Sequence, residues 1–438
     1  MQLQRPVPAS RFSRLVQLGR LGSGIAGAVV GEGLRQISNG NRPTAADLLL
    51  TPANAHRLAN HLSEMRGAAM KIGQLLSMEG GDILPDPLPN ILSRLRDQAH
   101  AMPLGQVADV LDSAWGADWK GKFRRFHFTP IAAASIGQVH EAETKDGRHL
   151  AIKIQYPGIA RSIDSDLNNV AGLFRMFRLL PPGLDIEPLL EEAKRQLHAE
   201  ADYLAEAQHL RSYASYLGSQ PGLRVPAVAD DLTTQTVLAM EYVAGEPIEM
   251  LASAPRDKRQ DVAVRLTELA LCELFDWRLM QTDPNFANFR YRAEEDEVVL
   301  LDFGATRRFD PALIAAFQTL IGASLGGDEN AIEHAAMDVG YLAPEDAPVY
   351  RRAVVDMVSI AAEPVRLVGP YDFGASDLSE RLSQHVVGMR IEHDFGRLPP
   401  PDMLYLHRKL GGLYLLLKRL NAKVSISDLI APYLSRRQ

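Results

Sequence analysis

The chain contains two short motifs, Asp283-Pro-Asn-Phe-Ala-Asn288 and, directly after the apolar run Val298-Val-Leu-Leu301, Asp302-Phe-Gly304. The two aspartates stand 19 residues apart. In this arrangement one aspartate orients an attacking oxygen, while the asparagine and the second aspartate bind magnesium. Asp-Phe-Gly alone is also ordinary turn chemistry, so it is the ordered pair of motifs that predicts a metal-dependent phosphoryl-transfer site.

The bulk composition is typical of a globular chain. Its 438 residues suffice for two or three subdomains, and 46% apolar with 23% charged residues argues against broad disorder. The net charge of −7 gives no indication of a nucleic-acid partner. The single cysteine, Cys272, cannot form an internal disulfide, and the twelve histidines show no zinc-type spacing. No apolar run reaches the ~20 residues that a membrane-spanning helix needs.

The predicted elements follow the order helices, a small sheet with inserted helices, and a large helical body. Residues 46–99 have a helical pattern, and the turn Lys145-Asp-Gly-Arg148 between two strand-like runs predicts a β-hairpin. We predict helices at residues 159–180 and 186–217, strands at 138–144, 149–155, 223–229 and 236–243, and mostly helix from residue 256 onward. This order is the two-lobed α+β layout expected of the protein-kinase-like fold that the two motifs predict.

We divide the chain into four parts. They are a basic, glycine-containing N-terminal extension (1–45), a helical extension (46–115), an N-lobe with inserted helices (116–245) and a helical C-lobe (246–438). The first part carries four arginines before its first acidic residue. This bias suits a mitochondrial presequence and equally a basic segment on anionic lipid. We favour the lipid interpretation, because Gly27 and Gly31 are spaced for close helix packing.

The loop that covers phosphates in such a fold reads G-x-G-x-x-G-x-V and leads into a hairpin. Here the aligned sequence is Ala132-Ala-Ala134-Ser-Ile-Gly137-Gln-Val139, so alanines replace the first two glycines. The added methyl groups restrict close approach to phosphate, which predicts altered nucleotide preference and weak activity on proteins. An ordinary alanine-rich loop is the alternative. The candidate nucleotide contacts in this loop are Ala132, Ala134, Ser135, Gly137 and Gln138.

A lysine and an acidic partner are expected next. Leu150-Ala-Ile-Lys153 occupies the place of the V-A-I-K motif, whose lysine binds phosphates. A glutamate on a following helix should pair with it, and Glu200-Ala-Asp202-Tyr-Leu-Ala-Glu206 offers three acids. On one continuous helix Asp202 and Glu206 share a face, and Glu200 is turned away from Asp202. The segment therefore presents two acidic faces for two lysines, although a solvated acidic face is the alternative.

A second lysine, in Met70-Lys71-Ile-Gly-Gln74, lies in a helical run at residues 62–78. The small residues of this run permit close approach of another element, but the local sequence alone gives Lys71 no chemistry. Farther on, Met240-Glu-Tyr-Val243 ends the strand predicted at 236–243, and its backbone is predicted to offer adenine contacts at Glu241 and Val243.

Together these motifs resemble the UbiB family of atypical kinases, most closely the branch that supports coenzyme Q (ubiquinone) biosynthesis. The resemblance runs from about residue 60 to the end. It is carried by Lys71-Ile-Gly-Gln74, the loop at 132–138, Glu200-x-Asp202, Gln281-Thr-Asp283-Pro-Asn-x-x-Asn288, Asp302-Phe-Gly304 and Leu406-His-Arg-Lys-Leu-Gly-Gly412.

The resemblance implies that the K-x-G-Q helix lies over the active site and occludes the place of a protein substrate. It also implies that Lys71 contacts the Glu-x-Asp motif and the nucleotide side. Finally, it makes Glu206 the partner of Lys153, with Glu200 as the alternative.

Two departures from ordinary protein kinases fit this family. Thr282 stands where an arginine normally precedes the catalytic aspartate, so a phosphorylated activation loop has no local anchor. The helix expected near Pro311 follows Asp-Phe-Gly closely and leaves little room for a peptide-docking segment. The literal Ala343-Pro-Glu345 lies too far from Asp302 to be the kinase signature, and we interpret it as a helix start.

We expect a protein that binds ATP or ADP with Mg²⁺ between two lobes. Its activity would be ATP hydrolysis, or phosphorylation of a small or lipid-like molecule rather than of proteins, in support of ubiquinone biosynthesis. The expected catalytic residues are Asp283, Lys153 and Lys71, and the expected magnesium ligands are Asn288 and Asp302. The alternative is a nucleotide-gated lipid-binding scaffold, a pseudokinase for quinone-biosynthesis enzymes. An antibiotic kinase ranks last, because it does not explain the K-x-G-Q motif.

The expected partners follow from this interpretation. They are an adenine nucleotide, an anionic lipid or membrane surface, and lipid intermediates or proteins of quinone biosynthesis; a homodimer stays open, and nucleic acid is not expected. The expected location is cytoplasmic, peripheral to the inner (plasma) membrane of a bacterium. The mitochondrial matrix face is the alternative.

Overall fold

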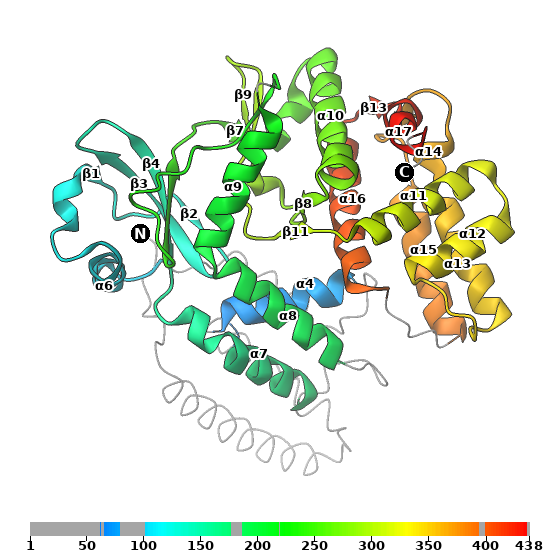
Figure 1. The fold of residues 1–438 in the computed structure, drawn as a ribbon, viewed down its shortest axis with the longest axis horizontal. Helices are drawn as coiled ribbons and strands as arrows, with labels where there is room; N and C mark the ends of the chain where they lie inside the picture. Colours follow the sequence, from blue (N-terminus) through cyan, green and yellow to red (C-terminus); the bar gives the residue numbers. More distant parts are fainter. Residues whose placement is uncertain are drawn as a thin grey trace, which may run out of the picture. The chain divides into compact units, whose positions relative to one another are not determined.

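The computed structural model of the protein describes Leu62 and residues 65–78, 101–176, 186–218, 220–393 and 399–435 (Figure 1). These residues form two compact units. Unit 1 comprises the described residues up to Ala207 together with Val228–Tyr242, and unit 2 comprises Gln208–Ala227 and the residues from Val243 onward. The N-terminal extension at 1–45 lies outside the described residues, and the domain boundaries at 45, 115 and 245 stay predictions.

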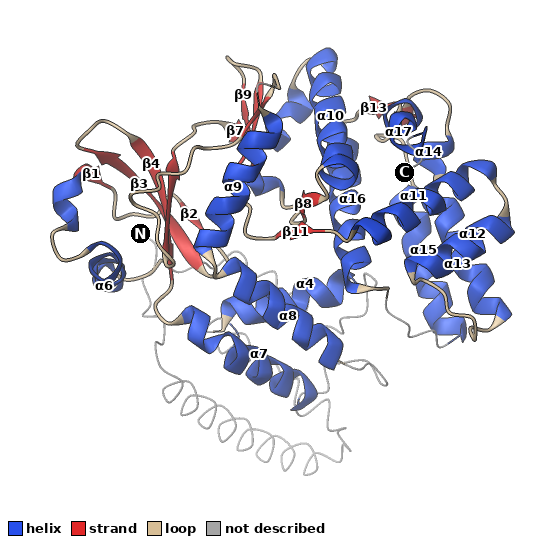
Figure 2. Ribbon diagram, viewed as in Figure 1, coloured by secondary structure: helices blue, strands red, loops and turns tan. Residues whose placement is uncertain are grey.

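Unit 1 is built on a five-stranded antiparallel sheet in the order β1-β3-β4-β6, with β2 paired to β3 (Figure 2). The strands are β1 (Phe123–Phe126), β2 (Ala132–Ala133), β3 (Gly137–Thr144), β4 (His149–Gln155) and β6 (Val237–Glu241). The predicted hairpin is confirmed: Val139 of β3 lies opposite Lys153 of β4, and Gly147 has φ +90° in the turn. The apolar sequence of β4 makes it almost wholly buried, against a core that includes α6 (Leu104–Trp115).

Three helices of unit 1 pack on one another, namely α4 (Arg66–Met78), α7 (Ile159–Met176) and α8 (Glu187–Glu200). The prediction of one continuous helix over residues 186–217 is wrong, because α8 ends at Glu200 and α9 spans Tyr203–Leu217. Asp202 explains the break: its side chain accepts a hydrogen bond from the Ala205 N–H at 3.0 Å, as a helix-capping aspartate does. Glu200 and Glu206 therefore lie on different helices.

Unit 2 contains a small sheet in the order β5-β10-β9-β7 and two strand pairs, β8 with β11 and β12 with β13. The strands are β5 (Leu223–Arg224), β7 (Glu246–Pro247), β8 (Leu279–Gln281), β9 (Phe289–Arg292), β10 (Glu297–Leu300), β11 (Thr306–Arg308), β12 (Tyr371–Asp372) and β13 (Lys423–Val424). The strand predicted at 223–229 is thus much shorter, and Val228 forms only an isolated bridge to Met240.

The rest of unit 2 is mainly helical. Its helices are α10 (Arg256–Leu271), α11 (Pro311–Gly326), α12 (Glu329–Val339), α13 (Pro348–Ala361), α14 (Glu363–Arg366), α15 (Leu378–His393), α16 (Pro401–Arg419) and α17 (Ile426–Ser435). Asp310 caps α11 by accepting a hydrogen bond from the Ala312 N–H at 2.7 Å. The interpretation of Ala343-Pro-Glu345 as a helix start is wrong, because the next helix begins only at Pro348.

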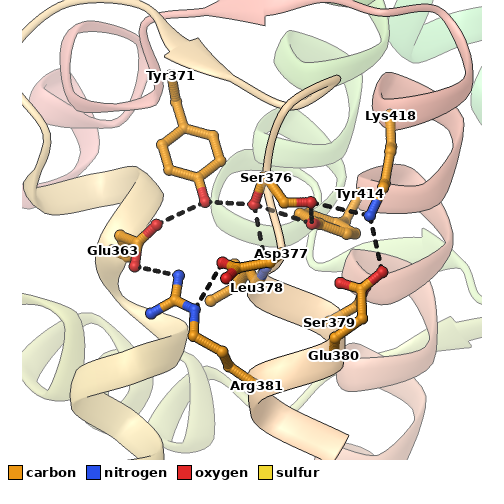
Figure 3. Close-up of polar contacts among 10 residues, drawn as sticks. All are labelled: Glu363, Tyr371, Ser376, Asp377, Leu378, Ser379, Glu380, Arg381, Tyr414 and Lys418. Atoms are coloured by element: carbon orange, nitrogen blue, oxygen red, sulfur yellow. Dashed lines mark hydrogen bonds and ion pairs between the residues drawn. The ribbon is translucent and has the colours of Figure 1, made fainter.

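A polar network fastens the start of α15 to its neighbours in unit 2 (Figure 3). The Tyr371 hydroxyl donates to Glu363 at 2.7 Å and lies 2.6 Å from the Ser376 hydroxyl. From α16, the Tyr414 hydroxyl donates to the Ser376 side-chain oxygen at 2.9 Å, and Lys418 Nζ donates to the Ser376 carbonyl oxygen at 2.8 Å.

Within the part of the chain that the structure describes, we find no helix long and apolar enough to cross a bilayer.

Candidate active site

Lys153, the predicted nucleotide lysine, projects from β4 and is only 6% exposed. Its Nζ donates to both carboxylate oxygens of Glu206, at 2.8 and 2.9 Å, and lies 5.2 Å from the Tyr203 ring centroid. Tyr203 and Glu206 both lie in the first turn of α9. They are three residues apart and therefore share one face of the helix, so both can reach Lys153. The structure thus pairs Lys153 with Glu206 and not with Glu200.

Lys71 of α4 forms an ion pair with Glu200 at the end of α8, and its side chain is buried. Ser135 of the alanine-rich loop donates to the other Glu200 carboxylate oxygen at 2.6 Å. Gly67, one turn before Lys71, lies against the same loop, since a Cβ there would stand 3.1 Å from the Ser135 carbonyl oxygen. The helix, the loop and α8 therefore meet at Glu200. The contact of Lys71 with the Glu-x-Asp motif, which the resemblance implied, is present at Glu200, while its contact with the nucleotide side and its role stay predictions.

The alanine-rich loop is a tight turn between β2 and β3. The Ala134 N–H donates to the Gly137 carbonyl oxygen at 2.9 Å, and Ala132 is exposed. Gly137 has no room for a side chain, because a Cβ would stand 2.3 Å from the Ile154 carbonyl oxygen. The one glycine that the loop retains is therefore the one that the packing of β4 requires.

Four other candidate residues have different surroundings. The Gln138 side chain is buried, accepts from the Met102 N–H at 2.8 Å and lies 2.7 Å from the His140 ring, so it serves the core of unit 1. Asp202 caps α9, as described above. Glu241 is the last residue of β6, and Val243 lies two residues beyond it.

In unit 2, Asp283 lies in the loop that joins β8 to β9. Asn288 donates from Nδ2 to Asp283 Oδ2 at 3.1 Å, which ties together the two ends of the motif. Asn285 shapes the short helical turn η4 (Phe286–Asn288) by accepting a hydrogen bond from the Ala287 N–H at 3.1 Å. The Leu301 N–H donates to the Asn288 carbonyl oxygen at 2.9 Å, so the loop lies beside the residue that precedes Asp302.

Asp302 lies just after β10, and its Oδ1 accepts a hydrogen bond from the Gly304 N–H at 2.9 Å. The two motifs are tied together at Thr282, whose backbone N–H and hydroxyl both donate to the Ala305 carbonyl oxygen, at 3.1 and 2.7 Å. Phe303 is fully buried. Asp283, Asn288 and Asp302 therefore belong to one hydrogen-bonded assembly within unit 2.

Sequence reasoning missed two residues of α16. Arg408 donates to Asp283 Oδ1 at 2.5 Å, so both carboxylate oxygens of Asp283 have partners. Gly412 lies against the same loop, since a Cβ there would stand 1.9 Å from the Pro284 Cβ. The stretch from Leu406 to Gly412 carried part of the family resemblance, and that was the signal. Its role is visible only once α16 and the loop are placed together.

Asn288 and Asp302 fit magnesium by their chemistry, since amide and carboxylate oxygens are ligands that Mg²⁺ accepts. Because Asn288 Nδ2 donates to Asp283, the Asn288 Oδ1 is the atom left for a metal. Among the described residues there is no cluster of three or more His, Cys, Asp or Glu side chains suited to a metal. Magnesium bound with a nucleotide needs only one or two carboxylates, because phosphates and water complete its coordination.

The strand lysine with its helical glutamate, and the Asp283 loop hydrogen-bonded to the Asp-Phe-Gly segment, define the class of protein-kinase-like proteins. Residues 94–336 match a family described as the ABC1 atypical kinase-like domain. The chain belongs to this family of atypical kinases, which is also called the UbiB family. The family and the kinase-like fold class predicted from the sequence are both confirmed.

Named relatives agree with this assignment. The chain is 38% identical over 428 residues to atypical kinase COQ8B, mitochondrial, of Rattus norvegicus, an alignment that covers 97% of this chain and 81% of that protein. It is 37% identical over 426 residues to atypical kinase COQ8, mitochondrial, of Saccharomyces cerevisiae, with coverages of 97% and 84%. Among solved structures, an Rv3197–erythromycin complex from Mycobacterium tuberculosis is similar at 26% identity and a TM-score of 0.60, covering 86% of this chain and 95% of that one.

Proposed function

We propose that the protein binds a magnesium adenine nucleotide and transfers its terminal phosphoryl group to water or to a small or lipid-like molecule. The observation that carries this proposal is the hydrogen bond from Asn288 to Asp283, in a loop that is tied to the Asp302 segment. A phosphoryl-transfer site needs one oriented carboxylate and two metal ligands, and this assembly supplies those residue types.

Each residue has a role in this proposal. Lys153, held by Glu206, binds phosphate oxygens, while backbone groups at Glu241 and Val243 bind the adenine. Asn288 and Asp302 hold Mg²⁺, which neutralises negative charge on the phosphates when it is bound. Asp283 orients the attacking hydroxyl or water. The loop residues Ala132, Ala134, Ser135, Gly137 and Gln138 cover the phosphates, with Gln138 contributing backbone only.

A small acceptor is favoured over a protein. Thr282 offers no cation to a phosphorylated loop, and only residues 305–310 separate Asp-Phe-Gly from α11. Lys71, buried against Glu200, holds α4 beside the alanine-rich loop, which supports the idea that the K-x-G-Q helix excludes a peptide. Family membership and the COQ8 relatives support a role in ubiquinone biosynthesis at a membrane surface. The word mitochondrial in the relatives' names favours the matrix face over the bacterial alternative.

The test is formation of ADP from ATP by the full chain, with and without anionic liposomes and a quinone-precursor-like phenol, because ADP is released whether water or the phenol accepts the phosphoryl group. We expect Asp283→Asn to lower kcat by about 100-fold or more, since it removes the group that orients the nucleophile, while nucleotide affinity changes little. Asp338→Asn, an exposed residue of α12, is the matched control and should behave as wild type. Absence of ATP turnover in every condition would contradict the proposal.

One observation favours a second candidate, a nucleotide-gated scaffold. Arg408 and Asn288 both donate hydrogen bonds to the Asp283 carboxylate, one to each oxygen, so each oxygen that could orient a nucleophile already has a partner within the protein. In a scaffold, Asp283 would serve conformation and not chemistry. The same Asp283→Asn variant separates the two in cells. Loss of quinone with nucleotide binding retained favours catalysis, and normal quinone favours the scaffold.

A further inference from the structure

A buried charged cluster in unit 2 has no part in the reaction described so far. Glu273 and Lys409 form an ion pair at 2.7 Å, and they are 1% and 6% exposed. Glu273 lies in η3 (Cys272–Asp276), a π-helical turn that follows α10, and such turns are frequent at functional sites. A buried ion pair contributes little net stability, because the loss of hydration offsets the attraction. This pair therefore calls for an explanation other than stability.

Tyr213 of α9 joins the cluster and is fully buried. Its hydroxyl donates to Glu273 Oε1 at 2.8 Å and accepts a hydrogen bond from the Gln281 backbone N–H at 2.6 Å. Burial, reinforced by the Glu273 charge, raises the pKa of Tyr213 well above its ordinary value, so the hydroxyl keeps its proton. A protonated hydroxyl can donate to the carboxylate while it accepts from the backbone.

Gln281 is the point at which the cluster meets the Asp283 loop. It is the last residue of β8, two positions before Asp283, and its Nε2 donates to the Asp283 carbonyl oxygen at 2.8 Å. The Tyr213 ring also packs edge-on against Phe303 of Asp-Phe-Gly, with 4.5 Å between ring centroids. One tyrosine therefore contacts both the strand that leads to Asp283 and the residue that follows Asp302.

Lys409, the third residue of the cluster, lies on α16, and this helix also contacts the Asp283 loop. Lys409 is adjacent in sequence to Arg408, which pairs with the Asp283 carboxylate. Consecutive residues of one helix thus reach the cluster and the carboxylate, so a shift of α16 would move both contacts together.

We propose that Tyr213, Glu273 and Lys409 are positioning residues that fix the backbone of β8 and thereby hold Asp283 in place for phosphoryl transfer. The kinetic consequence rests on the proposed function. The effect on the backbone at Gln281 does not, so it is measured separately.

The first test is Tyr213→Phe in the full chain, which keeps the ring and removes the hydroxyl. Tyr216→Phe is the matched control, because Tyr216 lies one turn along α9, is 38% exposed and stacks on Trp277, which Tyr213 also contacts. Hydrogen–deuterium exchange is followed in peptides covering residues 279–288. We expect exchange at the Gln281 amide to be about tenfold faster in Tyr213→Phe, and unchanged in the control. Equal protection in both variants overturns the proposal.

The second readout is the split between kcat and KM for ATP. In Tyr213→Phe we expect kcat to fall about tenfold and KM to stay within about twofold, because the nucleotide contacts are untouched. If Tyr213 had only a structural role, Tyr213→Phe would lower the melting temperature, and kcat measured at temperatures well below that melting temperature would be unchanged. That outcome also overturns the proposal.

Glu273 and Lys409 are tested together. Lys409→Met alone would leave a buried carboxylate without its cation, so the double variant Glu273→Gln/Lys409→Met removes both charges at similar volume. We expect the double variant to fold and to show the faster Gln281 exchange and the lower kcat. Wild-type exchange and wild-type kcat in the double variant would remove these two residues from the assignment.

The outcomes also separate this proposal from the proposed function. Equal turnover by wild type and Asp283→Asn would sink the proposed function, yet exchange at Gln281 would still decide whether the cluster positions β8. If Asp283→Asn lost turnover while Tyr213→Phe matched wild type in both Gln281 exchange and kcat, the proposed function would stand. The positioning role alone would then be contradicted.

Discussion

At the scale of single residues, Asp296, in the turn between β9 and β10, has two cationic partners and one hydroxyl partner. Its carboxylate accepts hydrogen bonds from Arg265 at 2.7 Å and from the Tyr291 hydroxyl at 2.8 Å, and Lys258 lies 3.0 Å away. Arg265 above all holds the pKa of this carboxyl well below its ordinary value. The residue also has φ +56°, a conformation that aspartate and asparagine tolerate better than most side chains.

We expect Asp296→Asn to lower the free energy of unfolding by about 1 kcal/mol at pH 7, a small value because the side chain is 34% exposed. The folded pKa is lowered, so this stabilisation is complete above the unfolded pKa of about 4 and is lost as the pH falls below it. Urea unfolding at pH 7 and pH 3 should show the gap between wild type and variant narrowing at pH 3. Glu294→Gln, exposed in the same turn, is the control; a gap of equal size at both pH values would contradict the assignment.

At the scale of elements, α16 is shaped to lie against the Asp283 loop. Gly412 has no room for a methyl group beside Pro284, whereas a Cβ on the adjacent Gly411 would meet nothing within 4 Å. We expect Gly411→Ala to stabilise the protein by about 0.5–1 kcal/mol, through helix propensity alone. Gly412→Ala should instead destabilise it by about 1–3 kcal/mol, because overpacking forces α16 or the loop to shift.

Thermal unfolding and ATP turnover of the two glycine variants give the comparison directly. Gly412→Ala should also lower turnover, since the displaced loop carries Asp283, while Gly411→Ala should keep it. If both alanine variants were stabilised alike and equally active, α16 would not constrain the loop.

Elements that depend on neighbouring residues could be predicted from the sequence. The β3–β4 hairpin follows from strand patterns on either side of an Asp-Gly turn, and α11 follows from Asp310 and Pro311. The break between α8 and α9 was also encoded locally, by the capping side chain of Asp202, but helical periodicity on both sides concealed it.

Contacts between distant segments could not be predicted in this way. Arg408 reaches Asp283 across 125 residues of sequence, and Tyr213 reaches Glu273 across 60. No local pattern distinguishes these side chains from ordinary helical residues, because their partners are brought together only by the packing of unit 2. The motif residues could be named in advance since each motif is short. What holds the motifs in place had to come from the structure.

At the scale of the whole molecule, the candidate nucleotide residues are divided between the two units. Unit 1 carries Lys153, Glu206 and the alanine-rich loop, and unit 2 carries Asp283, Asn288 and Asp302. Each set has its own internal hydrogen bonds within its unit. A nucleotide that binds the folded chain and not the unfolded chain stabilises the folded state by mass action, whether or not phosphoryl transfer follows.

We expect ATP or ADP with Mg²⁺, at about 100 times its dissociation constant, to raise the free energy of unfolding by about 2.7 kcal/mol. Thermal unfolding of the full chain measures this as a higher melting temperature, and chelation of Mg²⁺ should remove most of the increase. Asp302→Asn should lose the magnesium-dependent part, because it replaces the carboxylate that we propose as a magnesium ligand by a neutral amide. Asp338→Asn should respond as wild type. A melting temperature that ignores both nucleotides in millimolar Mg²⁺ would contradict the ATPase and the nucleotide-gated scaffold together, because each requires the nucleotide to bind the folded protein.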